Sequence, residues 1–345
     1  PPCLTGGCAL VPWLSVPLLL SARSCPKADQ LPQAGMNQTQ ATEFVLLSFP
    51  RGRPFLFALF LAIYLATLLG NSAILCLVCL DPHLHSPMYF FLAHLSCLDL
   101  CYSSVTVPQV LAGAQAAQAS ISLRGCLAQA LALMWLAGAE CALLALMACD
   151  RVAAVCRGGG GGGGGGGCWL WGLLDAGLHT ALAARLSFCA PARLQHIFCD
   201  VPPLLAAACG DTGGGGLRRH PPNRLALHVC SVFVGLGPFL LVLVSYLCIL
   251  ATILRMPLAT SRRKAFSTCS AHLLVVTLFF VAANLNYNRP SSGYSPAADA
   301  LVSVLFCIAT PMLNPLIYSL RNRQVWGALR RALRVGGTPG SPGHA

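Results

Sequence analysis

The feature that most constrains this chain is its series of apolar stretches, each about as long as a lipid bilayer is thick. Seven of them run over 55–80, about 87–112, 127–155, 168–186, 225–255, 266–283 and 298–320. Crossing a bilayer takes about 20 apolar residues, and a helix satisfies its own backbone hydrogen bonds in lipid. The sequence therefore predicts an all-α membrane protein, a seven-transmembrane-helix bundle.

The composition agrees with a chain that lies mostly in lipid. It is 56% hydrophobic and only 9% charged, whereas a soluble domain carries about 25% charged residues. Its net charge of +12 comes from basic residues scattered between the apolar stretches, which disfavours nucleic acid as a partner. Most of the 19 cysteines stand singly inside apolar stretches, where they act as small buried residues.

Several functional classes find no support in the sequence. No nucleophile–base pair or metal-ligand cluster is visible, so an enzyme is not predicted. The two halves of the chain do not repeat each other with broken helices, and no ring of pore charges is present, which disfavours a transporter or a channel.

Loop charges and a glycosylation signal set the predicted orientation. Asn37 begins an Asn-Gln-Thr acceptor sequence for glycosylation, which indicates an extracellular N-terminus. Basic residues gather at 262–264 and 321–334, as they do in cytoplasmic segments. We therefore expect a multi-pass plasma membrane protein with its N-terminus outside and its C-terminus in the cytoplasm.

Four regions follow along the chain. Residues 1–35 are predicted to be an extension that precedes a natural start at Met36, residues 36–54 an extracellular N-terminus, and residues 55–320 the transmembrane domain. Residues 321–345 are the predicted cytoplasmic tail. Apolar residues recur in this tail with arginines between them, as in an amphipathic helix on the inner leaflet: Val325, Trp326, Leu329 and Leu333.

Two glycine runs, at 158–167 and 213–216, interrupt the pattern. Neither is followed by the Lys-Ser/Thr pair of a phosphate-binding loop. Ten glycines in a row do not hold a defined helix end. We interpret these runs as flexible linkers or as damage to the sequence.

Four polar side chains are expected inside the bundle, where charge is costly and usually functional. Asp99 and Glu140 lie in the middle of the second and third stretches, and Asn71 and Asn314 lie in the first and seventh. Brought together, they would offer the oxygen ligands that a hard cation such as sodium prefers. The alternative is a hydrogen-bonded polar core in which one carboxyl group is protonated.

Two further features indicate a moving part without establishing one. Asp150 and Arg151 lie at the inner end of the third stretch, where they form either a switch pair or an ordinary helix-end anchor. Pro315 within the seventh stretch frees a backbone carbonyl and permits a kink. Proline is also simply common in membrane helices.

Several longer motifs occur in order along the chain. They read PMYFFL at 87–92, LDLCYSS at 98–104, MACDR at 147–151, KAFSTCSAHL at 264–273 and PMLNPLIYSLRN at 311–322. In their residues, order and spacing these motifs resemble those of the odorant (olfactory) receptors of the tetrapod class. These are rhodopsin-like G-protein-coupled receptors, and the resemblance covers about 36–334.

The resemblance implies a receptor for small, mostly apolar, volatile odorants that activates a stimulatory olfactory G protein and raises cyclic AMP. It places a sodium-binding pair at Asp99 and Glu140. It also makes Arg151, Tyr246 and Tyr318 the residues that rearrange on activation. Beyond a sodium ion, no cofactor is implied.

The resemblance further implies a lid over an odorant pocket. Two disulfides, Cys126–Cys199 and Cys189–Cys209, would tie the second outer loop, and an oxidising exterior permits them. The pocket is expected between the third, fifth and sixth helices beneath that lid. Its candidate lining residues are Met134, Ala137, Gly138, Cys230, Val234, Phe280, Ala283 and Tyr287.

Some positions depart from the family pattern. Cys149 and Val152 stand where tyrosines are usual, and Arg157 with the glycine run replaces the Pro-Leu-His-Tyr stretch expected after Cys156. That loop normally helps to grip the G protein. These departures keep a second interpretation open: a receptor-derived chain that does not signal, from a decayed gene or a faulty gene model.

Overall fold

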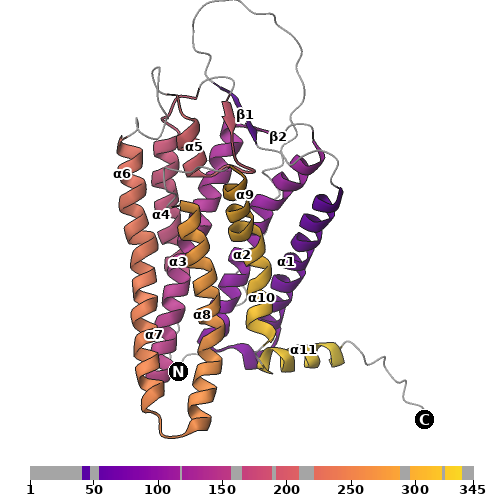
Figure 1. Cartoon of the computed structure of the whole chain (residues 1–345). Coiled ribbons are helices and arrows are strands. Elements are labelled where there is room, and N and C mark those ends of the chain that lie inside the picture. The colour runs from indigo at the N-terminus through magenta and orange to yellow at the C-terminus, as the bar shows by residue number, and fades with distance from the viewer. Residues whose placement is uncertain are drawn as a thin grey trace, which may run out of the picture.

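The computed structural model of the chain is a bundle of long, roughly parallel helices (Figure 1). It describes residues 41–46, 54–116, 119–156, 165–188, 192–209, 221–287, 296–320 and 323–335. Within this part of the chain, six helices are long and apolar enough to cross a membrane. A further helix, α4, packs against α3. The predicted seven-helix bundle is thereby confirmed.

The helical elements follow one another along the chain as α1 (Pro54–Leu80), η3 (Pro82–Leu84), α2 (Pro87–Gln115), α3 (Leu123–Cys156), α4 (Gly165–Ala183), α5 (Val201–Ala207), α6 (Pro221–Cys230), η5 (Ser231–Leu236), α7 (Gly237–Arg255), α8 (Ala259–Tyr287), α9 (Pro296–Val304), η6 (Leu305–Ala309), α10 (Thr310–Leu320) and α11 (Arg323–Val335). α11 lies across one end of the bundle (Figure 1). We call this end the tail end.

Two of the long rods contain a π-helical segment that stops just short of a proline. α6, η5 and α7 form one rod, because Cys230 and Leu236 at their junctions keep right-handed helical backbone angles. α9, η6 and α10 form another in the same way. Pro238 and Pro311 lack the N–H that would bond the carbonyl four residues back. The helix before each proline therefore adopts π-type hydrogen bonds, which join residues five apart. The sequence did not predict these widened turns.

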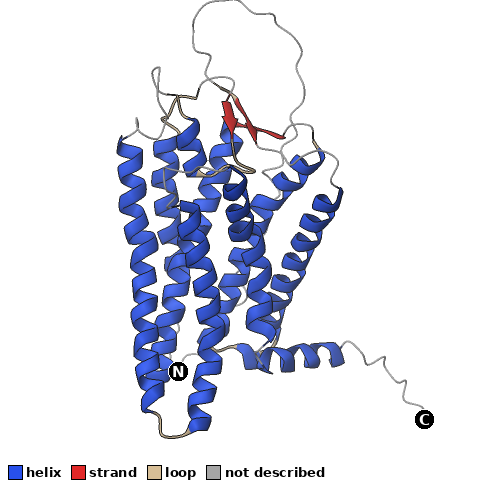
Figure 2. Cartoon of the chain, viewed as in Figure 1, coloured by secondary structure: helices blue, strands red, loops and turns tan. Residues whose placement is uncertain are grey.

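A small sheet covers the other end of the bundle, which we call the lid end (Figure 2). Its strands are β1 (Glu43–Leu46), β2 (Ala119–Ser122) and β3 (Ala192–Leu194), in the order β2-β1-β3. β1 pairs antiparallel with β2 and parallel with β3. The sequence analysis did not predict this sheet, in which three short segments far apart in sequence satisfy one another's backbone groups.

α3 lies at the centre of the bundle and packs against α2, α4, α7 and α8. Its closest approach to α4 depends on Gly172, where an added Cβ would overlap the backbone oxygen of Trp135 and the backbone nitrogen of Ala139. Small residues let membrane helices approach in this way. The Trp135 indole also donates a 2.8 Å hydrogen bond to the carbonyl of Trp169 on α4.

The start of α4 corrects one prediction. The last three residues of the long glycine run, 165–167, are helical, whereas we expected the whole run to be a linker or damage. Gly165 is buried, and an added Cβ there would lie 3.0 Å from the Phe90 ring and 2.8 Å from the His94 ring of α2. A larger residue here would displace the His94 ring, so glycine allows the start of α4 to pack closely against α2. The earlier glycines and the second run lie outside the described residues.

α8 is longer than predicted at both ends, since it spans Ala259–Tyr287 rather than 266–283. The prediction followed apolar residues only, so it left out the end turns, which contain polar residues such as Arg262 and Asn286. The predicted amphipathic helix of the tail is present as α11. Its buried residues Val325 and Ala328 pack on the tail end of α1 and α2.

Candidate functional site

The four polar residues predicted for the bundle interior are all buried, each no more than 3% exposed. The Asn314 side-chain amide donates to both carboxylate oxygens of Asp99, at 3.0 and 3.2 Å. The Asn71 amide donates to the backbone carbonyls of Thr67 and Pro311, at 3.1 and 3.0 Å. α1, α2 and α10 are thus joined by polar contacts inside an apolar core.

Three side-chain oxygen atoms in this polar core take part in no hydrogen bond. Asn71 Oδ1, Glu140 Oε1 and Asn314 Oδ1 are buried without a hydrogen-bond partner. Glu140 interacts electrostatically with Asp99. Buried acceptors without donors are costly, and carboxylate and amide oxygens are the ligands of hard cations. The donor set present here therefore fits a sodium ion.

A second polar cluster lies near the tail end, where α3, α7, α8 and α10 meet. Arg151 is buried and interacts electrostatically with Tyr246 and Tyr318. The Tyr246 hydroxyl hydrogen-bonds Nδ1 of His272 at 2.6 Å, and the two rings are stacked. Tyr318 OH and Asp150 Oδ1 are buried without hydrogen-bond partners. The cluster gathers the predicted switch residues, and His272 joins them although we gave it no role from the sequence.

The predicted pocket residues lie together in the part of the bundle nearer the lid end. Ala137, Phe280, Ala283 and Tyr287 belong to one hydrophobic cluster, and Met134 belongs to its neighbour. Aromatic rings surround them: Phe280 lies 5.4 Å from both Phe239 and Phe279, centroid to centroid. The side chains around these candidates are apolar and closely packed.

Gly138, Val234 and Cys230 have additional neighbours. A Cβ on Gly138 would lie 3.0 Å from the Gly172 backbone and 3.5 Å from Val234. Gly138 therefore serves the close packing of α3, α4 and η5. Cys230, also proposed for the pocket, lies against Asp175 and His179 of α4.

A chain of hydrogen bonds closes the lid end above these residues. His196 pairs with Ser303 at 2.8 Å, Ser303 donates to Asn286 at 2.9 Å, and Asn286 donates to Asp200 at 3.3 Å. The Tyr287 hydroxyl also hydrogen-bonds Asp200. The sequence analysis assigned no role to Asn286 and Ser303. The available signal was a polar residue within an otherwise apolar helix.

The Cys126–Cys199 disulfide joins the start of α3 to the segment that contains this chain of hydrogen bonds. Gln129 reinforces the link, because its side-chain oxygen accepts a 2.8 Å hydrogen bond from the Cys199 backbone N–H. Cys209 is also disulfide-bonded. Its predicted partner Cys189 and the glycosylation candidate Asn37 lie outside the described residues.

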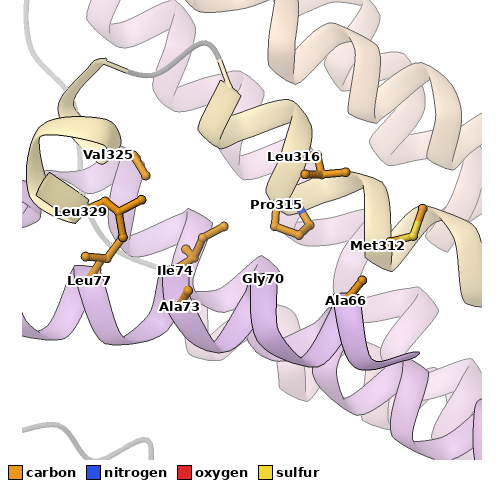
Figure 3. A pocket seen from close by; sticks show the side chains of 10 residues that line it. All are labelled: Ala66, Gly70, Ala73, Ile74, Leu77, Met312, Pro315, Leu316, Val325 and Leu329. Carbon is orange, nitrogen blue, oxygen red and sulfur yellow. The ribbon is translucent and has the colours of Figure 1, made fainter. Parts of the chain in front are cut away.

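A cavity of about 220 Å³ lies in a different place, between α1, α10 and α11 (Figure 3). Its lining is apolar throughout: Ala66, Gly70, Ala73, Ile74, Leu77, Met312, Pro315, Leu316, Val325 and Leu329. Gly70 faces Pro315, where an added Cβ would lie 3.2 Å from the proline ring. No polar side chain lines this cavity, so it has nothing with which to orient a ligand.

One cluster of metal-binding side chain types was missed by the sequence analysis. Asp175 and His179 on α4 and Cys230 at the end of α6 present ligand atoms that all lie within 4.8 Å of one another. Their separation along the chain concealed the cluster. No spacing rule relates a residue at 230 to a pair at 175 and 179.

Comparison with known proteins places this arrangement in a family. The family described as olfactory receptor matches residues 60–159 and 176–335, with an interruption over 160–175. Olfactory receptor 5AP2 of Mus musculus is 43% identical over 309 residues, which cover 86% of this chain and 95% of that protein. Olfactory receptor 12D1 of Homo sapiens is 40% identical over 312 residues, 87% of this chain and 95% of that protein.

A solved structure shares the fold. The crystal structure of squid rhodopsin superposes with a TM-score of 0.55 at 15% identity, covering 84% of this chain and 88% of that chain. At that identity the likeness concerns the fold alone. The sequence matches extend over almost all of the bundle and both of its polar clusters, so the chain belongs to the olfactory receptor family, whose members are G-protein-coupled receptors rather than enzymes.

Proposed function

We propose that this chain is a receptor for small, mostly apolar, volatile odorants that activates a stimulatory olfactory G protein and raises cyclic AMP. The observation that carries the proposal is the buried polar cluster at the tail end. Arg151, Tyr246 and Tyr318 come from three different helices and lie close enough to interact electrostatically. A movement of any one helix would break up this cluster, which suits a switch.

The orientation of the bundle follows from the same proposal. The tail end faces the cytoplasm, where the G protein binds, and the lid end faces outside the cell in the plasma membrane. Basic residues at the tail end support this, among them Arg262, Arg263 and the arginines of α11. We assign residues 55–320 to the receptor domain, 36–54 to an extracellular segment that carries glycosylated Asn37, and 321–345 to the cytoplasmic tail.

The odorant would bind beneath the lid, among the apolar side chains near α3, η5 and α8. Support comes from the shared hydrophobic clusters of Met134, Ala137, Phe280, Ala283 and Tyr287. Burial of apolar surface yields about 25 cal/mol per Å². A small volatile molecule held mainly by burial therefore suits such a lining.

We further propose that sodium binds in the polar core between Asp99 and Glu140. Support comes from the buried oxygens of Glu140, Asn71 and Asn314 that have no hydrogen-bond partner. A bound cation would satisfy these atoms and offset the repulsion between the two carboxylates. Binding there would favour the resting arrangement of α2, α3 and α10, which supply Asp99, Glu140 and Asn314.

A direct test uses cells that express residues 36–345 with cyclic AMP as the readout. A panel of apolar volatile compounds should contain at least one that raises cyclic AMP in a dose-dependent way. Replacing Ala283 on α8 by Phe should weaken or abolish that response without loss of surface display, because the added ring would fill the pocket. An unchanged response in this variant would count against the pocket.

The alternative function, a receptor-derived chain that does not signal, rests on one specific observation. The family match is interrupted over 160–175, where the glycine run replaces the expected loop. Genomic sequence across codons 158–167 separates the two candidates. An intact loop with the usual proline and tyrosine would remove the alternative.

A further inference from the structure

Asp175, His179 and Cys230 form a compact group of side chains at the contact between α4 and α6. These two helices pack side by side at the lid end of the bundle (Figure 1). Asp175 and His179 are four residues apart on α4, so they project from the same face of that helix. His179 Nε2 lies 3.5 Å from Asp175 Oδ1, and the Cys230 thiol hydrogen-bonds the Asp175 carboxylate.

The group is shielded from solvent but incompletely satisfied. The side chains of Asp175 and His179 are only 7% and 3% exposed. Asp175 Oδ1 is buried without a hydrogen-bond partner. A carboxylate in such a place is costly unless it is paired or binds a metal ion. His179 Nε2 lies 3.5 Å from this oxygen and forms no hydrogen bond with it.

The three ligand types select the kind of ion. A thiolate, an imidazole and a carboxylate are the ligands of Zn²⁺, with bonds of about 2.3, 2.0 and 2.0–2.2 Å. Ligand atoms already within 4.8 Å of one another need shifts of only about 1 Å to reach a shared ion at those bond lengths. Sodium and magnesium prefer sites made of oxygen alone.

The net charge of the occupied site also suits a low-dielectric environment. When Zn²⁺ binds, a Zn–S bond forms, and the Cys230 thiol loses its proton to solvent. One dication, one thiolate, one carboxylate and a neutral imidazole then sum to zero. A site with no net charge avoids most of the cost of placing an ion in the membrane region.

We propose that Asp175, His179 and Cys230 bind one Zn²⁺ ion, with a fourth position left open. Asp175 is the last residue of the interruption in the family match, so the site does not follow from membership in the family. The ion would clamp α4 to the rod formed by α6, η5 and α7. One of its ligands, Cys230, is also a candidate pocket residue.

Purified receptor in lipid nanodiscs tests the proposal without relying on signalling. After treatment with a chelator, wild-type protein should rebind Zn²⁺ with an affinity that falls at least about tenfold in Asp175→Asn, His179→Ala and Cys230→Ala, as loss of a ligand contact of 1.4 kcal/mol or more requires. Cys248→Ala is the matched control, since this free cysteine on α7 lies outside the cluster. Its affinity for Zn²⁺ should equal that of wild type.

Co²⁺ in place of Zn²⁺ identifies the thiolate. Wild-type and Cys248→Ala protein should show a thiolate-to-cobalt absorption band that Cys230→Ala lacks. Cys230→His should retain Zn²⁺ without the band, which separates a lost ligand from a misfolded protein. Wild-type affinity in all three ligand variants, loss in only one of them, or absence of the band from wild type would each overturn the proposal.

Discussion

In the hydrogen-bonded chain at the lid end, buried polar side chains bond to one another, whereas in the cluster at the tail end some of them have no partner. His196, Ser303, Asn286 and Asp200 form an unbroken chain from the lid segment to α8 and α9. At the tail end, Tyr318 OH and Asp150 Oδ1 are buried without hydrogen bonds. The four lid-end residues are buried, whereas Asp150 and Tyr318 are only partly buried as whole residues, so the two ends differ in burial as well as in bonding.

The contrast indicates that the lid end is fixed and that the tail end is able to move. A satisfied polar network holds one arrangement, because every other arrangement leaves a buried group unpaired. Unpaired groups instead lower the cost of a rearrangement that would give them partners. The lid end is therefore suited to hold a ligand cavity closed. The tail end is suited to change shape when a G protein supplies new contacts.

The largest expected effect is at the fixed end. Cys199→Ser removes the Cys126–Cys199 disulfide, which closes a loop of 73 residues and is worth about 2–5 kcal/mol. Surface display, measured by antibody staining of unpermeabilised cells, should be lost. The free cysteine Cys156 on the exposed surface of α3 provides the control Cys156→Ser, which should be displayed normally. Normal display of Cys199→Ser would contradict a lid end fixed by this bond.

A substitution at the movable end should affect signalling and not surface display. Arg151→Ala removes the guanidinium that interacts with Tyr246 and Tyr318, so cyclic AMP responses should be abolished while surface display persists. Arg124→Ala, at the exposed start of the same helix, should signal like wild type. If Arg151→Ala signals normally, the cluster is a structural anchor rather than a switch.

The chain of hydrogen bonds at the lid end should contribute a moderate amount of stability. Asn286→Ala leaves the Ser303 hydroxyl and an Asp200 oxygen without this partner in a buried site, at a cost of about 1–3 kcal/mol. The melting temperature of purified receptor should fall. Thr277→Ala, which removes an exposed hydroxyl from the same helix, should change stability by less than about 0.5 kcal/mol. Equal melting temperatures for the two variants would mean that the network does not fix this end.

Features that depend on apolar length or on single residues could be predicted from sequence. Apolar length alone located the spans, because lipid permits little besides helix. Single polar residues such as Asp99 and Glu140 could be recognised as buried, because charge inside a span is rare. The site to which they contribute also needs Asn314, which only the packing of α10 against α2 brings to Asp99.

Features that depend on contacts distant in sequence could not be predicted. The sheet at the lid end joins segments near 44, 121 and 193, and each is too short to give a period-two pattern. Cys230 was assigned to the pocket from its helix position in the family resemblance, and nothing in the sequence relates it to Asp175. The helical glycines at 165–167 have no intrinsic preference for helix. The contact of Gly165 with α2 overrides that weak propensity.

The smallest expected effect concerns the attachment of α11 at the movable end. Arg331 donates to the Asp81 carboxylate through Nε and Nη2, the former at 3.0 Å. This hydrogen bond is the largest cause that lowers the pKa of Asp81 from 3.8 to about 2, and His83 adds to it. Because the pKa is lowered in the folded protein, the contact is fully present above pH 3.8 and is lost as the pH falls towards 2.

The attachment should therefore be insensitive to pH between 5 and 8, within the range in which cells operate. Arg331→Ala should speed amide hydrogen exchange in α11 only severalfold, because Val325 and Ala328 still bury the apolar face of the helix and exposed ion pairs contribute little. Arg330→Ala, next along the same helix, should leave exchange unchanged. If the protection factor of wild-type α11, which is the intrinsic exchange rate divided by the observed rate, is lower at pH 5 than at pH 8, a group other than Asp81 holds this helix.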